Sequence, residues 1–244
     1  MAVSRDEMKP IWRALQVTVI PFFRAIVSIR REGTENVPRT GAFVIAPNHT
    51  TNIDPIIMGI GVFTAGRTPH FLGKASLFTI PVVKVLLKAT GQIPVERAGA
   101  SRANPLSTAA LVARRGSGVI VYPEGTLTRD PALWPMRGKT GAVRLALGAG
   151  IPLVPAAHWG TERFLPPYGR WLRIIPRQHI TVRFGEPVDL DDLRGRDLEP
   201  AVVNEATDRL MAAITALVAD LRGEQAPTER WDPAAHNQSE FGRP

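Results

Sequence analysis

Residues 42–60 read AFVIAPNHTTNIDPIIMGI, which places a polar loop between two apolar runs. The first run predicts a buried strand, and Pro55 stands where a helix can begin, because its fixed φ suits the first helical turn. The loop carries His49, with Asp54 five positions further on. A carboxylate can hold one ring nitrogen of a histidine and leave the other to accept a proton near neutral pH. The loop therefore predicts a general base at the end of a strand, although one such pair is a weak signal by itself.

The rest of the chain alternates between segments typical of strands and segments typical of helices. Strands are expected at residues 25–32, 43–46, 70–72, 92–95, 119–122, 151–157 and 180–184, the last as an outer strand. Helices are expected from residue 55 and at residues 77–88, 105–115, 138–147 and 202–221. The pattern predicts an α/β fold with a mixed, largely parallel sheet flanked by helices and an N-terminal amphipathic helical segment.

Three regions are expected along the 244 residues. Residues 1–24 form the N-terminal helical segment, residues 25–222 the main domain, and residues 223–244 a polar, poorly ordered tail. The first region has apolar residues at helical spacing with basic residues among them. This pattern is typical of a helix in the headgroup plane of a membrane, and equally of an amphipathic helix packed on the domain's own core. No segment is long and apolar enough to span a bilayer.

Composition narrows the classes of function. The chain has no cysteine, which excludes a disulfide framework, a thiolate zinc site and a cysteine nucleophile. The net charge of +8 favours an anionic partner, such as a phospholipid surface or a polyphosphate cofactor, or reflects solubility alone. No basic run is interleaved with aromatic residues, so no nucleic-acid partner is expected. No metal site is expected from the remaining histidines, which are scattered: His70, His158, His179 and His236.

Four polar segments follow predicted strands, at the positions where open α/β sheets usually place sites. One is the His49 loop, and the others are residues 73–78 (GKASLF), 91–97 (GQIPVER) and 122–126 (YPEGT). They add two basic residues, Lys74 and Arg97, at strand ends. Backbone N–H groups exposed in a tight Pro-Glu-Gly turn can bind an anion or a developing oxyanion.

In this order the four segments resemble the sequence blocks of the glycerolipid acyltransferase family, in particular of 1-acyl-glycerol-3-phosphate acyltransferases. The blocks stand here as NHTTNID, KASLF, GQIPVER and YPEGTLT, followed by the strand IPLVPAA and the segment FGEPVD. The resemblance covers about residues 33–187. It departs from the family at Leu127, where an arginine is usual, at Thr51, which replaces a serine, and at Tyr122, which replaces a phenylalanine.

The resemblance implies an enzyme that moves a fatty acyl group from a thioester to the free hydroxyl of lysophosphatidate, giving phosphatidate. It implies His49 as the general base and Asp54 as the residue that orients it. Arg97 and Arg129 are the candidates to replace the arginine missing at Leu127. The residues expected to bind substrate are Lys74, Arg97, Glu124, Gly125, Thr126 and Arg129.

The resemblance implies no cofactor, because the acyl thioester of coenzyme A or of acyl carrier protein is a co-substrate. It also implies a peripheral protein on the cytoplasmic face of the cell membrane, with an anionic membrane surface as partner. Residues 11–23, through Trp12, Phe22 and Phe23, and residues 82–87 are then the expected membrane contacts. Two other functions stay open: a thioesterase that uses the same pair, and a non-enzymatic peripheral membrane module.

Overall fold

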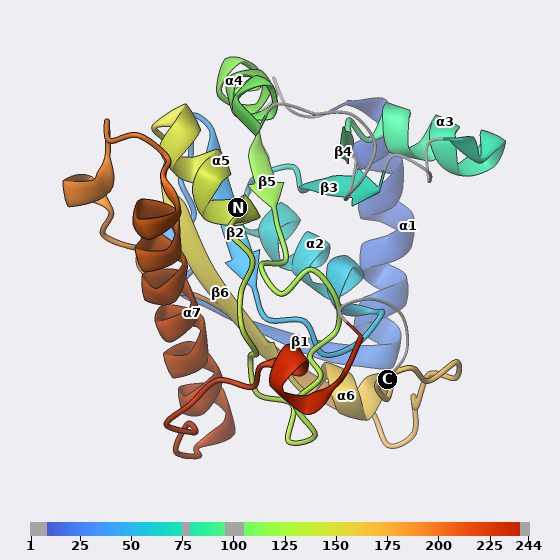
Figure 1. Cartoon of the computed structure of the whole chain (residues 1–244). Helices are drawn as coiled ribbons and strands as arrows, with labels where there is room; N and C mark the ends of the chain where they lie inside the picture. The colour runs from blue at the N-terminus through green and yellow to red at the C-terminus, as the bar shows by residue number, and fades with distance from the viewer. Residues whose placement is uncertain (1–8, 75–78, 96–104, 240–244) are drawn as a thin grey trace.

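The computed structural model describes residues 9–74, 79–95 and 105–239 and shows a seven-stranded sheet with helices on both faces (Figure 1). The strands are β1 (Val27–Glu32), β2 (Phe43–Pro47), β3 (His70–Lys74), β4 (Ile93–Val95), β5 (Gly118–Ile120), β6 (Leu153–Trp159) and β7 (Gln178–Phe184). Their order is β1-β7-β6-β2-β5-β3-β4. Every neighbouring pair is parallel except β6 with β7, which confirms the mixed, largely parallel sheet.

The expected position of β7 as an outer strand is wrong. It pairs with β1 on one side and β6 on the other, so the outer strand at this end of the sheet is β1. Along β7 the residues Ile180, Val182 and Phe184 are buried, whereas Thr181 and Arg183 between them are half-buried. The alternation arises because one face of the sheet is less covered at β7. An inner strand with one such face and a strand at the edge of the sheet have the same alternating pattern, so the sequence alone does not distinguish them.

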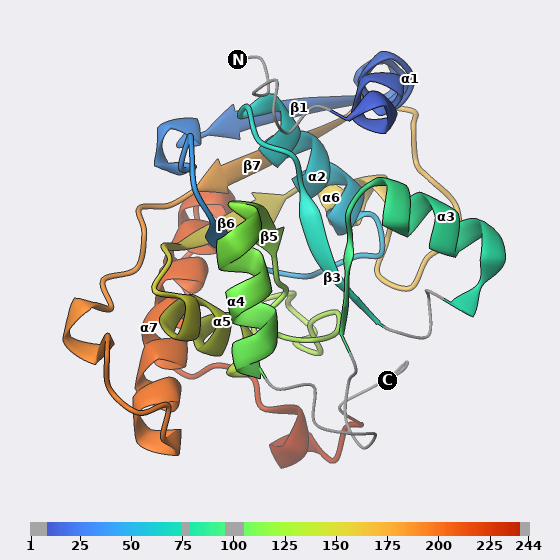
Figure 2. The same cartoon turned by 90° about the horizontal axis from the view of Figure 1, so that it is seen from above.

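The helices divide between the two faces of the sheet. They are α1 (Pro10–Ile26), α2 (Asp54–Thr64), α3 (Pro81–Ala89), α4 (Pro105–Arg115), α5 (Gly141–Ala149), α6 (Thr161–Phe164) and α7 (Pro200–Arg222). Seen from above, α4, α5 and α7 lie on one side of the sheet and α1 and α2 on the other (Figure 2).

Strand β2 lies at the centre of the sheet and contributes to a hydrophobic core on each face. Val44 and Ala46 pack in the cluster that includes α5 and α7. Phe43 and Ile45 pack in the cluster that includes α1 and α2. Successive side chains of a strand point to opposite faces, so a strand covered on both sides needs an unbroken apolar run. This double anchorage fixes the point at which the His49 loop begins.

Helix α1 packs on the domain's own core. Trp12 and Phe23 are 6% and 7% exposed, and Ile20 is buried beside them. The Trp12 ring lies 5.9 Å from the ring of Phe63 in α2, centroid to centroid. The expectation that Trp12 and Phe23 contact a membrane is therefore wrong, because both side chains fill the core; Phe22 is exposed as expected. Among the described helices, none combines the length and the apolar character that crossing a bilayer requires.

The described part of the C-terminal region, residues 223–239, packs against the domain rather than forming the poorly ordered tail that we predicted. The Arg137 N–H donates to the carbonyl oxygen of Trp231 at 2.9 Å. The Arg137 side chain also lies 3.0 Å from the Asp232 carboxylate. A short 3₁₀ helix, Pro233–His236, follows and is capped by Asp232. Its partners are distant in the sequence, which is why the polar composition alone indicated disorder.

Candidate active site

The candidate site lies where four neighbouring strands end. In the order β2, β5, β3 and β4 these strands are parallel, so their carboxyl ends meet at one edge of the sheet. The loop after β2 carries His49, the turn after β5 carries Glu124, and β3 ends at Lys74 (Figure 1). The sheet thus brings these three segments together, as the sequence predicted. Arg97 and the side chain of Lys74 lie outside the described part of the structure.

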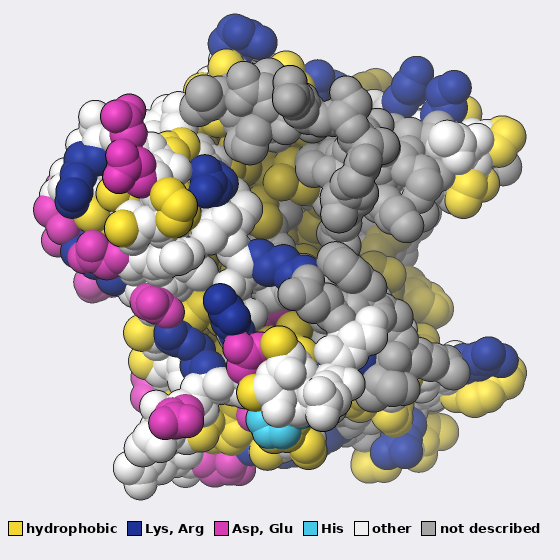
Figure 3. All heavy atoms as spheres, viewed as in Figure 1, with side chains coloured by type: hydrophobic (Ala, Val, Ile, Leu, Met, Phe, Trp, Pro, Cys, Tyr) yellow, Lys and Arg dark blue, Asp and Glu magenta, His cyan; other side chains and the backbone are white. Residues whose placement is uncertain are grey.

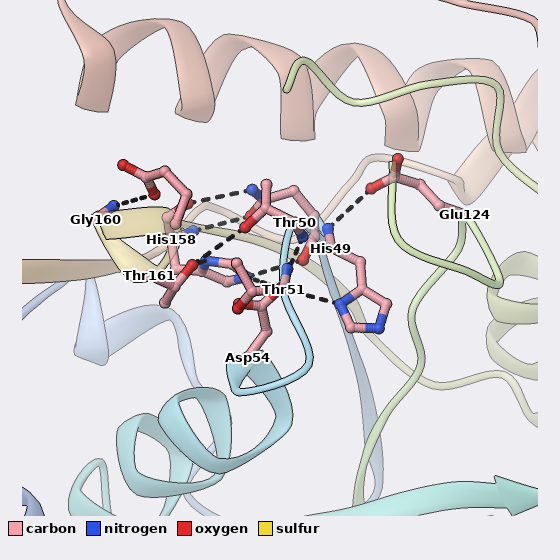
Figure 4. Close-up of polar contacts among 10 residues, drawn as sticks. His49, Thr50, Thr51, Asp54, Glu124, His158, Gly160 and Thr161 are labelled. Atoms are coloured by element: carbon pink, nitrogen blue, oxygen red, sulfur yellow. Dashed lines mark hydrogen bonds and ion pairs between the residues drawn. The ribbon is translucent and has the colours of Figure 1, made fainter. Parts of the chain in front are cut away.

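His49 and Asp54 form the hydrogen-bonded pair that their spacing predicts. The Nδ1 atom of His49 lies 3.0 Å from Oδ2 of Asp54 (Figure 4). A carboxylate oxygen only accepts, so Nδ1 carries a proton and donates it, and Nε2 keeps its lone pair. The His49 side chain is 16% exposed, whereas that of Asp54 is fully buried. The ring therefore presents its proton-accepting nitrogen on the side away from the carboxylate, as a general base requires.

Asp54 opens helix α2, and its own loop supplies donors to the carboxylate. Oδ2 accepts from the N–H groups of Thr50 at 2.7 Å and Thr51 at 2.8 Å. Oδ1 accepts from the Thr51 hydroxyl at 2.6 Å, so threonine supplies the hydroxyl expected of the family's serine. Burial would raise the pKa of Asp54, but the charge of His158 and the hydrogen bond from His49 outweigh it and lower the pKa to about 2. The carboxylate is therefore ionised at neutral pH.

His158, near the end of β6, belongs to the site, although its place in the sequence suggested no function. Its ring is fully buried, with Nε2 3.0 Å from the Asn48 carbonyl oxygen and 3.4 Å from Asp54 Oδ2. Because the carbonyl oxygen only accepts, Nε2 carries a proton and donates. The His158 N–H also donates to Asn48 Oδ1 at 2.9 Å, and Asn48 Nδ2 donates to the His158 carbonyl at 3.2 Å. These bonds attach the start of the His49 loop to β6.

Glu124 braces the His49 loop from the other side. Its Oε1 accepts from the His49 N–H at 2.9 Å, and its Oε2 accepts from the Met136 N–H at 3.1 Å. The Thr128 N–H donates to the His49 carbonyl oxygen at 2.7 Å. Both backbone groups of His49 are thus bonded to one turn. Glu124 is fully buried and both its oxygens accept from backbone N–H groups, which supports a role in positioning the base. Contact of Glu124 with substrate stays a prediction.

Glu124 should also make stability depend on pH. Burial raises its pKa from an ordinary 4.5 to about 8, helped by the charge of Asp54 and opposed by the bonds from Met136 and His49. Between these two values the folded protein holds a proton that the unfolded chain has released, so stability falls as pH rises. We expect the free energy of unfolding of the native protein, minus that of Glu124→Gln, to shrink between pH 5 and 8. The slope should be at most about 1.4 kcal/mol per pH unit, measured by denaturant titration.

An identical pH dependence for the two proteins would contradict the raised pKa of Glu124. Aspartate at the same position is not a suitable control, because its shorter side chain would reach neither backbone donor at these distances. The Gln variant keeps the length and removes the titration, and it replaces one acceptor oxygen with an NH₂ group that cannot accept from the backbone N–H facing it. This replacement lowers stability by an amount that does not depend on pH, so the pH dependence still reports the titration of Glu124.

Tyr122 packs against the face of the His49 ring. The two rings are stacked with their centroids 4.1 Å apart. Burial, and secondly the charge of Asp54, raise the pKa of the Tyr122 hydroxyl well above its usual value, so it stays protonated at neutral pH. The aromatic ring limits rotation of the imidazole, a role that either tyrosine or the family's phenylalanine can fill.

The turn after Glu124 has the conformation that a Pro-Glu-Gly sequence favours. Gly125 has a φ of 74°, which a residue with a side chain rarely adopts. Thr126 is half-buried, and Leu127, at the position of the family's arginine, is 5% exposed. Arg129 is only 4% exposed, so most of its side chain lies inside the protein. Contact of Gly125, Thr126 and Arg129 with substrate stays a prediction.

Comparison with known proteins places this site in a family. A family model described as Acyltransferase matches residues 28–159, more than half of the chain. The chain belongs to the acyltransferase family. The matched region contains His49, Asp54, Glu124 and His158.

Over the described residues, no group of three or more His, Cys, Asp or Glu side chains lies close enough together to hold a metal ion.

Several relatives of this acyltransferase family member have names that specify a reaction. The chain is 28% identical to the chloroplastic 1-acyl-sn-glycerol-3-phosphate acyltransferase BAT2 of Brassica napus, over 62% of this chain and 41% of that protein. It is 30% identical to the 1-acyl-sn-glycerol-3-phosphate acyltransferase of Bacillus subtilis, over 65% of this chain and 72% of that protein. The chain spans about half the length of other relatives that it matches, between 40% and 56%.

A solved structure has the same fold. The crystal structure of the 1-acyl-sn-glycerophosphate acyltransferase PlsC from Thermotoga maritima aligns with a TM-score of 0.60, over 84% of this chain and 78% of that one. The two sequences are 24% identical over this alignment, so the likeness supports the architecture of the sheet and helices and no finer inference.

Proposed function

We propose that this protein moves a fatty acyl group from an acyl thioester to the free hydroxyl of 1-acyl-glycerol-3-phosphate and forms phosphatidate, a step of phospholipid biosynthesis. The observation that carries the proposal is the His49–Asp54 pair, with one nitrogen held by a buried carboxylate and the other available. The names of the relatives from Brassica napus and Bacillus subtilis support the choice of acceptor.

The pair can perform the transfer with balanced proton movements. His49 Nε2 takes the proton of the acceptor hydroxyl as that oxygen attacks the thioester carbonyl carbon. The tetrahedral intermediate collapses by breaking the carbon–sulfur bond, and the imidazolium gives its proton to the departing thiolate. Asp54, 3.0 Å from Nδ1, stabilises the imidazolium. The acceptor oxygen is itself the nucleophile, so no side chain carries the acyl group.

Two further groups of residues complete the proposed site. Lys74 ends β3 and Arg97 follows β4 in the sequence, and both strands end at the edge of the sheet that carries the His49 loop. Arg129 follows Thr128, which bonds to His49. These three cations would hold the acceptor phosphate. The Gly125 N–H donates to the Tyr122 carbonyl oxygen at 3.1 Å within this turn, so the Thr126 N–H is the backbone group that would contact glycerol or the developing oxyanion.

An apolar groove beside the His49 loop suits an acyl chain. Its volume is about 420 Å³, within the range of small-molecule pockets. It runs between α1, α2 and α3 and includes Pro55 and Ile56, directly after Asp54. Leu15, Phe63 and Leu87 line it further along. A chain bound in this groove would have its carbonyl end near the His49–Asp54 pair.

The proposed donor is an acyl thioester of coenzyme A or of acyl carrier protein, and the proposed site of action is the cytoplasmic face of an anionic membrane.

A comparison of two acceptors tests the proposed function. With a labelled thioester, we expect rapid acylation of 1-acyl-glycerol-3-phosphate and little acylation of 1-acyl-glycerol, which lacks the phosphate. Positional analysis of the product should place the label on the hydroxyl at the middle carbon. Equal rates with both acceptors would contradict recognition of the phosphate.

The replacement for the arginine missing at Leu127 can be identified by kinetics. If Arg97 binds the phosphate, Arg97→Ala should raise the KM for the acceptor by about tenfold or more and leave the KM for the donor nearly unchanged. At the other candidate, Arg129, the same two KM values are measured for Arg129→Lys. Lysine keeps the positive charge in a buried position but cannot bind a phosphate with two parallel N–H groups, so a raised KM for the acceptor alone would indicate that Arg129 binds the phosphate. Equal effects of Arg97→Ala on both KM values would argue against this role for Arg97.

A further inference from the structure

Residues 170–177, between α6 and β7, read RWLRIIPR and are exposed throughout. Trp171 is 85% exposed and Ile175 is 87% exposed, with Leu172 and Ile174 exposed between them. A protein surface rarely presents several large apolar side chains together in water unless they bind something. We call these eight residues the 170–177 loop.

The loop is held beside the C-terminal end of α1. The Arg173 N–H donates to the carbonyl oxygen of Phe164 at 2.7 Å, and Phe164 packs on Phe23 of α1 with ring centroids 6.4 Å apart. At the other end, the Arg177 guanidinium donates to the carbonyl oxygen of Arg24, the last turn of α1, at 2.5 Å. The exposed side chains are therefore presented from a backbone that is attached on both sides.

The other large apolar side chains that are exposed in the described residues come from α1, α2, α3 and the residue before α3: Val17, Phe22, Ile56, Ile80 and Val85. Figures 1 and 2 both place α1, α3 and the segment between α6 and β7 along one flank of the molecule, away from α7. At the right-hand edge of Figure 3, hydrophobic side chains lie next to basic ones. The apolar surface is thus gathered on one flank.

The three elements that carry most of these exposed apolar side chains have charges of one sign. Helix α1, helix α3 and the 170–177 loop contain no acidic residue. Their basic residues are Arg13, Arg24, Lys84, Lys88, Arg170, Arg173 and Arg177. On the other side of the molecule charges of both signs pair with one another, as Arg209 does with Asp192 and Glu205. An apolar surface with basic residues alone complements an anionic lipid surface.

We infer that the 170–177 loop docks this protein on an anionic bilayer by placing Trp171 and Ile175 among the lipid headgroups. Tryptophan favours this depth of a membrane, and an arginine can keep its guanidinium at the phosphates while its stem lies among apolar groups. The inference rests on the proposed function only in choosing a bilayer rather than a protein as the partner. It assigns the membrane contact to a different segment from Trp12 and Phe23, which are buried.

Vesicle sedimentation of the full chain tests the inference without reference to turnover. The native protein should bind vesicles of phosphatidylcholine with phosphatidylglycerol, and bind vesicles of phosphatidylcholine alone less well. Trp171→Ala with Ile175→Ala should weaken binding to the mixed vesicles by about tenfold or more at every salt concentration. Arg170→Gln with Arg173→Gln should weaken binding by about fivefold per arginine at low salt, and by less at high salt.

Two measurements keep the outcome decisive. Ala201→Glu with Ala212→Glu adds charge to exposed positions of α7, on the other flank, and should bind vesicles as the native protein does. Turnover of a short-chain, water-soluble acceptor should be unchanged in the loop variants, so loss of the activity and loss of docking can be told apart. Unchanged vesicle binding by the Trp171 and Ile175 variant would overturn the inference. So would a lipid-free dimer of the native protein that this variant dissociates, because the loop would then bind a second copy of the chain.

Discussion

His49→Ala is expected to lower the rate of acyl transfer by about 10³-fold or more while the protein stays folded. The substitution removes the proton acceptor and leaves no other group in its place. It does not disturb the loop backbone, because Glu124 and Thr128 bond to the N–H and carbonyl groups of His49 rather than to its ring. Asp54 keeps its donors from Thr50 and Thr51. The rate is measured as labelled phosphatidate formed from a labelled thioester.

A matched variant separates lost chemistry from lost packing. His49→Gln retains a side chain that can contact Asp54 and pack beside Tyr122, but it cannot take a proton at neutral pH. It should be as inactive as the alanine variant, with a thermal transition close to that of the native protein. Transfer by either folded variant at more than about a tenth of the native rate would show that the base lies elsewhere.

Asp54→Asn is expected to lower kcat by about 10²-fold or more, with a smaller effect on either KM. The asparagine oxygen can occupy the position of Oδ2 and still accept from His49, Thr50 and Thr51. Its NH₂ group then takes the position of Oδ1 and donates to the Thr51 hydroxyl, which can turn to accept. The fold and the tautomer of His49 are therefore kept, and the charge that stabilises the imidazolium is lost.

Thr51→Val is the control for the Asp54 prediction. It removes one hydrogen bond to the carboxylate and leaves its charge, so we expect about a tenfold loss at most. An Asp54→Asn protein with more activity than Thr51→Val would contradict an electrostatic role for Asp54. A large rise in the acceptor KM alone would instead place Asp54 in substrate binding.

The local parts of the site could be predicted from the sequence, and the long-range parts could not. His49 and Asp54 lie in one loop between a strand and a helix, so five positions of sequence define their contact. His158 contacts Asn48 across 110 positions, and nothing near either residue signals the pairing. Glu124 was recognisable through its Pro-Glu-Gly turn, but its buried bonds to His49 and Met136 depend on tertiary packing.

The sequence also does not show which apolar side chains are buried in the core and which lie on the surface. The periodicity of α1 correctly predicts a helix with an apolar face, but periodicity does not say whether protein or lipid covers that face. Trp12 and Phe23 proved to be core residues. Helix α5 begins at Gly141, three residues later than expected, because the Lys139 N–H donates to the carbonyl oxygen of Pro123 in the Glu124 turn. Residues 170–177 are held in place by contacts such as that of Arg177 with Arg24, 153 positions away, which periodicity does not report.

Thiol release and labelled products, measured together with and without 1-acyl-glycerol-3-phosphate, distinguish transfer by the His49–Asp54 pair from hydrolysis. We expect one phosphatidate for each thiol released, and only slow thiol release when the acceptor is left out. The His49→Ala protein sets the background in both conditions. Release of free fatty acid at the same rate whether or not the acceptor is present would identify a thioesterase and contradict acyl transfer to the lipid hydroxyl.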